Sequence, residues 1–183
     1  MSDISSTLNY LYSLHSRGIK PGLERLELFL DKIGNPHKSF KSFHIAGTNG
    51  KGTVANIVYA VLLANGYSVG LYTSPHLLKF NERIVIKGVE IDDLEIASFV
   101  TRHRDLIDEL QLTFFEITTA MAFDAFRKAS VDYAVIEVGL GGRLDATNLV
   151  SPLTSVICDI SMDHEEWLGK SIKQIAAENR LYQ

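Results

Sequence analysis

A glycine-rich segment with one lysine occupies residues 47–53, between a short apolar run and a longer one. Glycines let the backbone approach an anion closely, and N–H groups at the start of a helix donate to phosphate oxygens. Lys51 would place its ammonium group on the phosphates, and Thr53 could offer its hydroxyl to a magnesium ion. The segment therefore predicts a phosphate-binding loop, the alternative being a tight turn with a surface lysine. Its members are Gly47, Thr48, Asn49, Gly50, Lys51, Gly52 and Thr53.

The spacing within this segment departs from the general Walker A pattern. That pattern has four residues between the first glycine and the Gly-Lys pair, and here two residues separate Gly47 from Gly50. A further glycine separates Lys51 from Thr53. The compressed spacing argues against an ordinary P-loop hydrolase or kinase.

Three more polar residues follow predicted strands. Ser74, Glu137 and His164 each lie at or after the carboxyl end of a different strand, which is the edge where open α/β sheets bind ligands. Taken singly, Ser74 could form a turn, Glu137 could pair with Arg143, and His164 could be solvent-exposed. Their convergence with the glycine-rich segment favours a magnesium or manganese site beside a nucleotide.

Two other features are less specific. Phe114, Phe115 and Glu116 open a predicted helix, where the two rings could cradle a flat heterocycle, although aromatic residues at helical spacing more often lie in the core. Cys158 lies within a predicted strand, and we expect it to be a small, inert apolar residue.

The hydrophobic pattern alternates strands with helices of ten or more residues, which is typical of βαβ units around a parallel sheet. Asp92 is a predicted helix N-cap, with Glu95 completing the capping pattern. The apolar runs at 131–138 and 153–160 are typical of strands covered on both faces. We expect helices at 3–16, 21–33, 53–64, 93–110, 113–129 and 171–180, strands at 40–46, 68–73, 131–138 and 153–160, and a hairpin at 82–91.

The composition fits one globular domain. The chain has 183 residues, 46% hydrophobic and 22% charged, with a formal net charge of −4, so no basic excess marks a nucleic-acid surface. The longest apolar run, residues 58–64, is far shorter than the roughly 20 residues that span a bilayer. A single cysteine, Cys158, favours a reducing compartment. We therefore expect a cytoplasmic monomer that binds neither nucleic acid nor membranes.

The assembled motifs resemble the folylpolyglutamate synthase/dihydrofolate synthase family, a branch of the Mur-ligase superfamily of ATP-dependent amide-forming ligases. The resemblance covers nearly the whole chain, and the motifs stand in the family's order. The segments that carry it are GLERLELFLDKIGNP (22–36), HIAGTNGKGT (44–53), TSPHLLKFNERIVIKG (73–88), TFFEITTAMAF (113–123), EVGLGGRLDATN (137–148) and DHEEWLG (163–169).

The resemblance implies that ATP phosphorylates a dihydropteroate or folate carboxylate and that the amine of L-glutamate then displaces phosphate. It implies catalytic roles for Lys51 and His164, and phosphate binding by residues 47–53. It implies one or two magnesium ions held by Thr53, Ser74, Glu137 and His164. It also implies a substrate side made of Phe80, Asn81, Arg83, Phe115, Glu116, Arg143 and Asp145.

Two departures from the family pattern accompany the resemblance. The family has a C-terminal domain that binds glutamate, whereas residues 1–183 correspond to an incomplete ATP-binding domain of the Mur-ligase central type. The family also reads Glu-Lys-Ala-Gly-Ile where this chain has Asn179 in place of the lysine, which family members carbamylate as a metal ligand. We therefore expect a truncated form with little activity alone, the alternatives being a non-catalytic nucleotide-binding remnant and a P-loop ATP hydrolase.

Overall fold

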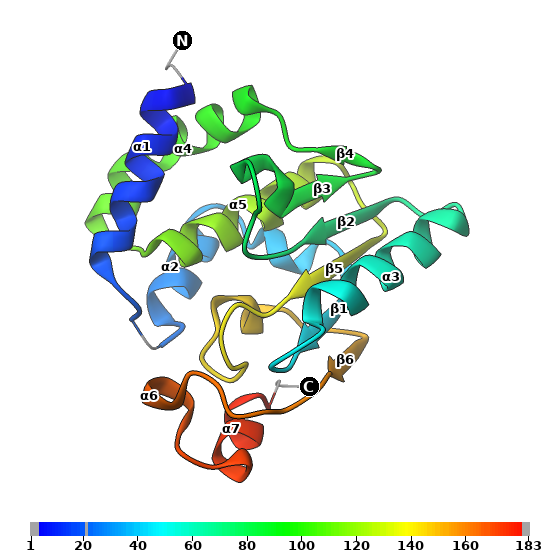
Figure 1. Ribbon diagram of the computed structural model, residues 1–183. Coiled ribbons are helices and arrows are strands. Elements are labelled where there is room, and N and C mark those ends of the chain that lie inside the picture. The colour runs from blue at the N-terminus through cyan, green and yellow to red at the C-terminus, as the bar shows by residue number, and fades with distance from the viewer. Residues whose placement is uncertain (1–3, 21, 181–183) are drawn as a thin grey trace.

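A six-stranded sheet runs through the molecule, and the computed structural model describes it over residues 4–20 and 22–180 (Figure 1). The strand order is β4-β3-β2-β5-β1-β6. β2, β5, β1 and β6 pair with one another in parallel, and the β3–β4 hairpin adds to β2 in the antiparallel sense. The strands are β1 (Lys41–Ala46), β2 (Val69–Tyr72), β3 (Ile84–Ile86), β4 (Val89–Glu90), β5 (Tyr133–Glu137) and β6 (Thr154–Ile157).

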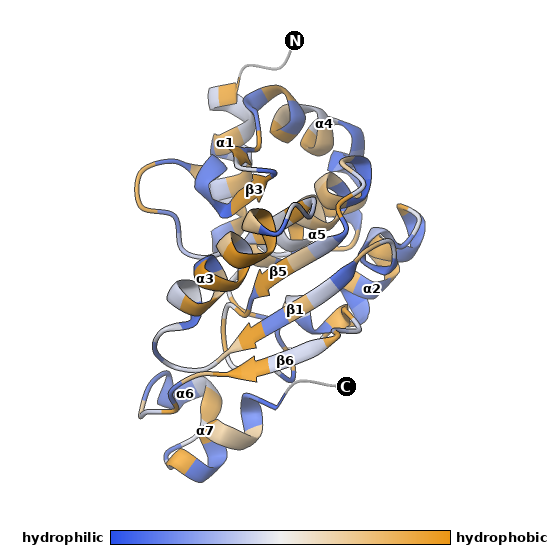
Figure 2. Ribbon diagram, turned by 90° about the vertical axis from the view of Figure 1, so that its right-hand side faces the viewer, coloured by the Kyte–Doolittle hydropathy of each residue, from blue (hydrophilic) through white to orange (hydrophobic). Residues whose placement is uncertain are grey.

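Helices cover both faces of this sheet, so the predicted α/β class is confirmed. Figure 2 shows β5, β1 and β6 side by side with the same direction and α3 along one side of them. The helices are α1 (Ile4–Ser13), α2 (Glu24–Lys32), α3 (Lys51–Ala64), α4 (Asp93–Glu109), α5 (Phe114–Lys128), α6 (Glu165–Leu168) and α7 (Ile172–Glu178), with short 3-10 turns at η1 (Leu14–Arg17), η2 (Pro36–Lys38), η3 (Phe80–Arg83) and η4 (Ala146–Leu149).

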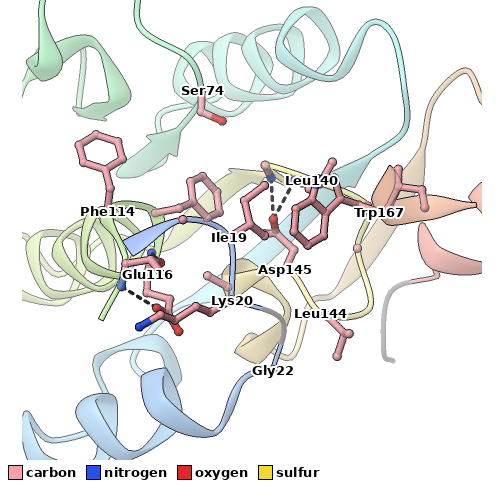
Figure 3. Close-up of a pocket in the computed structure, with 18 of the residues that line it drawn as sticks. Ile19, Lys20, Gly22, Ser74, Phe114, Glu116, Leu140, Leu144, Asp145 and Trp167 are labelled. Atoms are coloured by element: carbon pink, nitrogen blue, oxygen red, sulfur yellow. Dashed lines mark hydrogen bonds between the residues drawn. The ribbon is translucent and has the colours of Figure 1, made fainter. Parts of the chain in front are cut away.

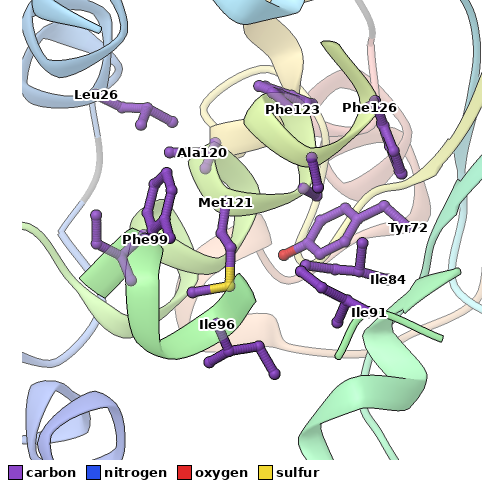
Figure 4. Close-up of a cluster of buried hydrophobic side chains, with 14 of the residues drawn as sticks. Leu26, Tyr72, Ile84, Ile91, Ile96, Phe99, Ala120, Met121, Phe123 and Phe126 are labelled. Atoms are coloured by element: carbon purple, nitrogen blue, oxygen red, sulfur yellow. The ribbon is translucent and has the colours of Figure 1, made fainter. Parts of the chain in front are cut away.

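Alternating strand residues supply two separate cores. Ile45, Leu71 and Val135 face α3 and pack against its Ala55 and Tyr59. The opposite face carries the larger core, in which helices α1, α2, α4 and α5 meet the sheet (Figure 4). Because α5 is buried along most of its length, it needs apolar residues on nearly every side. Its neighbours in this core include Tyr72, Ile84, Ile96, Phe99 and Leu26.

Side-chain caps set the start of two helices. Asp92 accepts a hydrogen bond from Glu95 N at the start of α4, as predicted. Thr113 and Glu116 form a reciprocal capping box at the start of α5. The predicted helix at 3–16 is α-helical only to Ser13 and continues as a 3-10 turn. The predicted start of the next helix at Pro21 lies outside the described residues.

The prediction that residues 153–160 form a strand covered on both faces is wrong. β6 contains four residues and lies at the edge of the sheet, pairing only with β1. Thr154 and Ile157 are exposed, because no element of the described chain packs outside this strand. Among the described residues, no helix is both long and apolar enough to cross a membrane.

We predict that Gly70→Ala will destabilise the fold. A Cβ at Gly70 would lie 2.4 Å from Cδ1 of Phe126, a ring in the larger core, and overpacking of a core costs roughly 1–3 kcal/mol. Urea unfolding would measure the loss. Phe126→Leu should relieve the clash, so the double variant should be less destabilised than the sum of the two single variants. Simple additivity would show that this contact does not limit packing.

Candidate functional site

The glycine-rich segment forms the turn between β1 and α3. Gly47 and Gly50 have φ values of +131° and +83°, a backbone region that favours glycine. A Cβ at Gly47 would lie 3.0 Å from both Cys158 and the Asp159 carbonyl, so the loop runs directly against the end of β6. The helix begins at Lys51 instead of the predicted residue 53, because Gly50 serves as its left-handed N-cap.

The chain that follows β6 holds this loop in place. Thr48 N donates to the Asp159 carbonyl at 2.6 Å, and Thr48 Oγ1 accepts from Ser161 N at 3.0 Å. Asn49 Nδ2 donates to the Asp159 carboxylate at 3.0 Å. The first N–H groups of α3 have no partner within the helix. The loop therefore presents a rigid start of a helix, which suits an anion.

Lys51 directs its ammonium group back over the loop. Its Nζ donates to the carbonyl oxygens of Gly47 at 2.8 Å and Thr48 at 3.1 Å. The positive charge therefore lies beside the helix start, where phosphate oxygens would add to its acceptors.

Glu137 and Ser74 meet beside the same helix start. Ser74 N donates to Glu137 Oε2 at 2.9 Å, and Oε1 would lie 3.4 Å from a Cβ at Gly52. Burial raises the pKa of Glu137, while the Ser74 amide and the Lys51 charge act in the opposite direction. Arg143, a possible partner in the sequence analysis, instead pairs with Glu178 at 3.0 Å.

His164 reaches the loop from a different side. It has a left-handed backbone (φ +47°) at the start of α6, and its imidazole is exposed. It lines a small cavity of about 10 Å³ with Gly47, Thr48 and Lys51. His164 Nε2 lies 3.6 Å from Asp163 Oδ2, and no described contact joins it to Ser74 or Glu137. Thr53 is exposed on the first turn of α3.

These donors fit one divalent cation that also binds phosphate. No residue that the structure describes donates a hydrogen bond to Glu137 Oε1, and the residue as a whole is only 4% exposed. In residues 4–20 and 22–180 no three His, Cys, Asp or Glu side chains gather around a point. Mg²⁺ is commonly held by one or two carboxylates and completes its shell with phosphate and water oxygens, so Glu137 is the carboxylate here that could take part in such a site.

A cavity of about 450 Å³ opens next to the loop (Figure 3). Ser74 lies at one end, and Trp167 of α6 lies near Leu140 and Asp145. Gly139, Leu140 and Gly141 line both this cavity and the small one at Lys51. These three residues therefore form a wall shared by the small cavity at the glycine-rich loop and the large cavity, called the shared wall below.

The large cavity divides the predicted substrate residues into two groups. Arg83, Phe115, Glu116 and Asp145 line it. The others have different neighbours: Phe80 is buried in the core, Asn81 donates to the Ile91 carbonyl at 2.7 Å, and Arg143 pairs with Glu178.

Two of the cavity residues are largely engaged in local structure. Glu116 accepts from Thr113 N at 2.7 Å and pairs with Arg25 at 3.1 Å. Phe115 lies directly over Gly139, where a Cβ would come within 2.3 Å of the ring. Because Gly139 has no side chain, the Phe115 ring can pack directly against the backbone of the shared wall.

Several cavity residues were missed by the sequence analysis. Ile19 and Lys20 follow the helix that ends near Arg17, and Trp167 lies on the four-residue helix α6. Their sequence signals are an Ile-Lys pair after Gly18 and a single tryptophan inside the DHEEWLG segment. Neither pattern has a period that would point to a binding surface.

A buried network holds the shared wall. Asp145 Oδ2 accepts from Gly139 N at 3.1 Å and from Leu140 N at 2.9 Å, while its Oδ1 accepts from Thr147 N and Thr147 Oγ1. Burial raises the pKa of Asp145, and these four donors oppose that rise. Both oxygens of the Asp145 carboxylate therefore accept hydrogen bonds within the folded chain, Oδ2 from the shared wall and Oδ1 from Thr147.

His44 extends this network beneath the sheet edge. His44 Nε2 lies 2.7 Å from Thr147 Oγ1. Because the Thr147 hydroxyl proton goes to Asp145, Thr147 must accept from His44 Nε2–H. The imidazole is then neutral, and its Nδ1 is buried without a partner in the described chain. Burial lowers the pKa of His44 to about 4.

Asn179 connects the last described helix to the loop. It is 1% exposed, its Oδ1 accepts from Gly47 N at 3.1 Å, and its Nδ2 donates to the Ile175 carbonyl at 2.8 Å. One loop amide is therefore occupied by a protein acceptor, and the side chain at this position carries no charge.

Comparisons with known proteins identify the family of the chain. Residues 45–182 match the family described as the Mur ligase middle domain. The dihydrofolate synthase/folylpolyglutamate synthase of Bacillus subtilis is 43% identical over 175 residues, which are 90% of this chain and 41% of that protein. The chain thus spans about two fifths of the length of such relatives.

Solved structures give the same result. A crystal structure of folylpolyglutamate synthase from Thermotoga maritima superposes with a TM-score of 0.86 at 44% identity, covering 96% of this chain and 41% of that one. A complex of FPGS with AMPPCP and folate superposes with a TM-score of 0.88 at 38% identity, covering 97% of this chain and 45% of that one.

We predict that Thr147→Val will loosen the shared wall. The valine removes the hydroxyl that joins Asp145 to His44 and leaves both buried groups short of a partner, which costs roughly 2–3 kcal/mol of unfolding free energy. Urea unfolding would measure this loss, and amide exchange at Gly139 and Leu140 should quicken. Thr147→Ser keeps the hydroxyl and serves as the matched control. Equal effects of both substitutions would contradict a role for the hydroxyl.

We also predict that the protein loses stability in mild acid because of His44. Above pH 6.5 the imidazole is neutral in both folded and unfolded chains and contributes nothing to the pH dependence. Between pH 6.5 and about 4 the unfolded chain binds a proton that the folded chain does not. The free energy of unfolding therefore decreases as the pH is lowered through this range, by roughly 3 kcal/mol in total. His44→Phe should flatten this part of the profile measured by urea unfolding, and an unchanged slope would contradict the assignment.

Proposed function

Because the chain belongs to the Mur ligase family, in its folylpolyglutamate synthase/dihydrofolate synthase branch, we propose that it is the ATP-binding part of a ligase that adds L-glutamate to dihydropteroate or to folates. Residues 1–183 would then be an incomplete domain of the Mur-ligase central type. The remaining part of such an enzyme would bind glutamate.

The proposed reaction has two steps. A carboxylate oxygen of dihydropteroate or folate attacks the γ-phosphorus of ATP, and the β–γ bridging bond breaks to give an acyl phosphate and ADP. The amine of L-glutamate then attacks the acyl carbon, phosphate leaves, and the ammonium proton is released to solvent as the amide forms. Neither step needs a protein nucleophile, so catalysis consists of positioning and neutralisation of charge.

The shared wall at Gly139–Gly141 is the observation that carries this proposal. It lines both the cavity at Lys51 and the large cavity. A nucleotide bound at the loop and a flat acid bound in the large cavity would therefore be separated only by the backbone of these three residues. The volume of about 450 Å³ suits a small organic ligand. A hydrolase that uses only water has no need of this second cavity.

The loop residues Gly47, Thr48, Asn49, Gly50, Gly52 and Thr53 would surround the phosphates, and Lys51 would stabilise the charge on the transferred phosphoryl group. Glu137, Ser74 and Thr53 would hold a magnesium ion, which supplies neutralisation of phosphate charge when bound. His164, which lines the small cavity at Lys51, would have a catalytic role there. Arg83, Phe115, Glu116 and Asp145 would form the substrate side.

The other expectations follow the same proposal. ATP, L-glutamate and the folate or dihydropteroate acid would be the small-molecule partners, and Cys158, which has no disulfide partner, suits a reducing cytoplasm. The neutral Asn179 at the loop supports one magnesium ion instead of two. A nucleotide-binding remnant without turnover is the second candidate, favoured by the bond from Gly47 N to Asn179 Oδ1.

We predict that the chain binds ADP and AMPPCP in the presence of Mg²⁺ and that Lys51→Met weakens binding by roughly ten- to a hundredfold, the value of charge-assisted hydrogen bonds. Isothermal titration calorimetry would measure both affinities. Lys173→Met, at an exposed position on α7, is the matched control. No ADP binding, or equal affinities of the Lys51 and Lys173 variants, would contradict the assignment of the loop.

Release of ADP from ATP separates the candidate activities. Release that depends on dihydropteroate and glutamate supports the ligase, and release without them supports a hydrolase. Binding without release supports the non-catalytic remnant.

A further inference from the structure

We propose that His76 is a positioning residue that holds the Arg83 guanidinium at the wall of the large cavity, where it receives the carboxylate of the ligand. This inference rests on the proposed function, since it concerns an acid bound in the same cavity. It assigns a role to a histidine that the nucleotide and metal chemistry does not use.

Arg83 lacks the partner that a buried arginine usually has. Its side chain lines the large cavity, and the residue is only 7% exposed. It forms no ion pair with any residue that the structure describes. A buried charge is costly unless it is paired, so this guanidinium is suited to an anion supplied from outside the chain. Its planar fork matches a carboxylate, which it can bind through two N–H groups.

His76 fixes the orientation of the Arg83 guanidinium. Arg83 Nε donates to His76 Nδ1 at 2.8 Å. Arginine cannot give up its proton inside a protein, so Nδ1 must be the acceptor and the imidazole must be neutral with its proton on Nε2. Because Nε is engaged on one side, the two Nη groups remain for a ligand.

The surrounding chain makes this pair rigid. The guanidinium packs 5.2 Å from the centre of the Phe114 ring, and the Arg83 carbonyl accepts from Thr73 N at 3.0 Å. Glu82 accepts N–H bonds from residues 77, 78 and 79 at 2.7–2.9 Å, which orders the loop between His76 and Arg83. The pair is therefore set before a ligand arrives, which lowers the entropy cost of binding.

Aromatic rings also surround His76. Its imidazole contacts the rings of Tyr12 and Phe80.

The position of Arg83 agrees with the proposed chemistry. Ser74 and Arg83 line the same cavity, and Ser74 N is hydrogen-bonded to Glu137 beside the nucleotide loop. The positive charge of Arg83 lowers the pKa of Glu137, which places both groups in one electrostatic field. A ligand carboxylate at Arg83 would therefore share the cavity with Ser74, whose N–H is bonded to Glu137.

The test compares two substitutions of His76. Phenylalanine removes the acceptor, whereas asparagine offers Oδ1 in nearly the same place as Nδ1. Calorimetry would give the affinities of wild type, His76→Phe and His76→Asn for dihydropteroate and for its carboxamide, an uncharged analogue. Wild type should prefer the carboxylate by roughly tenfold, the value of one charge-assisted hydrogen bond. His76→Phe should lose this preference with little change in carboxamide affinity, and His76→Asn should keep it.

A second readout needs no ligand. Hydrogen exchange at Arg83 Nε, followed by NMR, should be slow in wild type and His76→Asn and fast in His76→Phe. An unchanged carboxylate preference in His76→Phe would overturn the role of His76 and leave the proposed function standing. Equal affinity of wild type for both ligands, or binding of neither, would overturn Arg83 as the carboxylate receptor. The proposed function fails separately, through the absence of ADP binding.

Discussion

Parallel pairing of β2, β5, β1 and β6 is the constraint on which the site depends. Parallel strands end at the same edge of a sheet, and the register aligns Ile45 with Glu137 and Ala46 with Ile157. Ser74, Glu137 and the glycine-rich loop therefore meet without a long excursion of the chain, since each lies within a few residues of a strand end. If one strand slipped by a single residue, Glu137 would turn to the opposite face of the sheet.

Hydrogen bonds from backbone N–H groups to polar side chains keep that edge in one conformation. Asp145 fastens Gly139 and Leu140, Asn179 fastens Gly47, and Glu82 fastens the loop that ends at Arg83. The Asp145 and Glu82 carboxylates each accept from three backbone N–H groups, and Asn179 Oδ1 accepts from one. The Glu137 carboxylate and the Arg83 guanidinium are less completely paired than these, and they lie beside the glycine-rich loop and the large cavity, respectively.

Sequence patterns predicted the sheet, the glycine-rich loop and the cap at Asp92, because these depend on local spacing and periodicity. They did not predict the Asp145–Thr147–His44 network or the His76–Arg83 pair. Those contacts depend on side-chain directions and on the course of loops that have no period. The error at β6 has a similar origin, since an apolar run reports the composition of a strand but not whether another element covers it.

The indole of Trp167 adds a practical property. It is the single tryptophan of the chain, it is about half exposed, and it lines the large cavity near Leu140. Its emission spectrum will therefore shift when a ligand excludes water from that end, without interference from other indoles. Tryptophan fluorescence can therefore report whether the large cavity is occupied, without an added label.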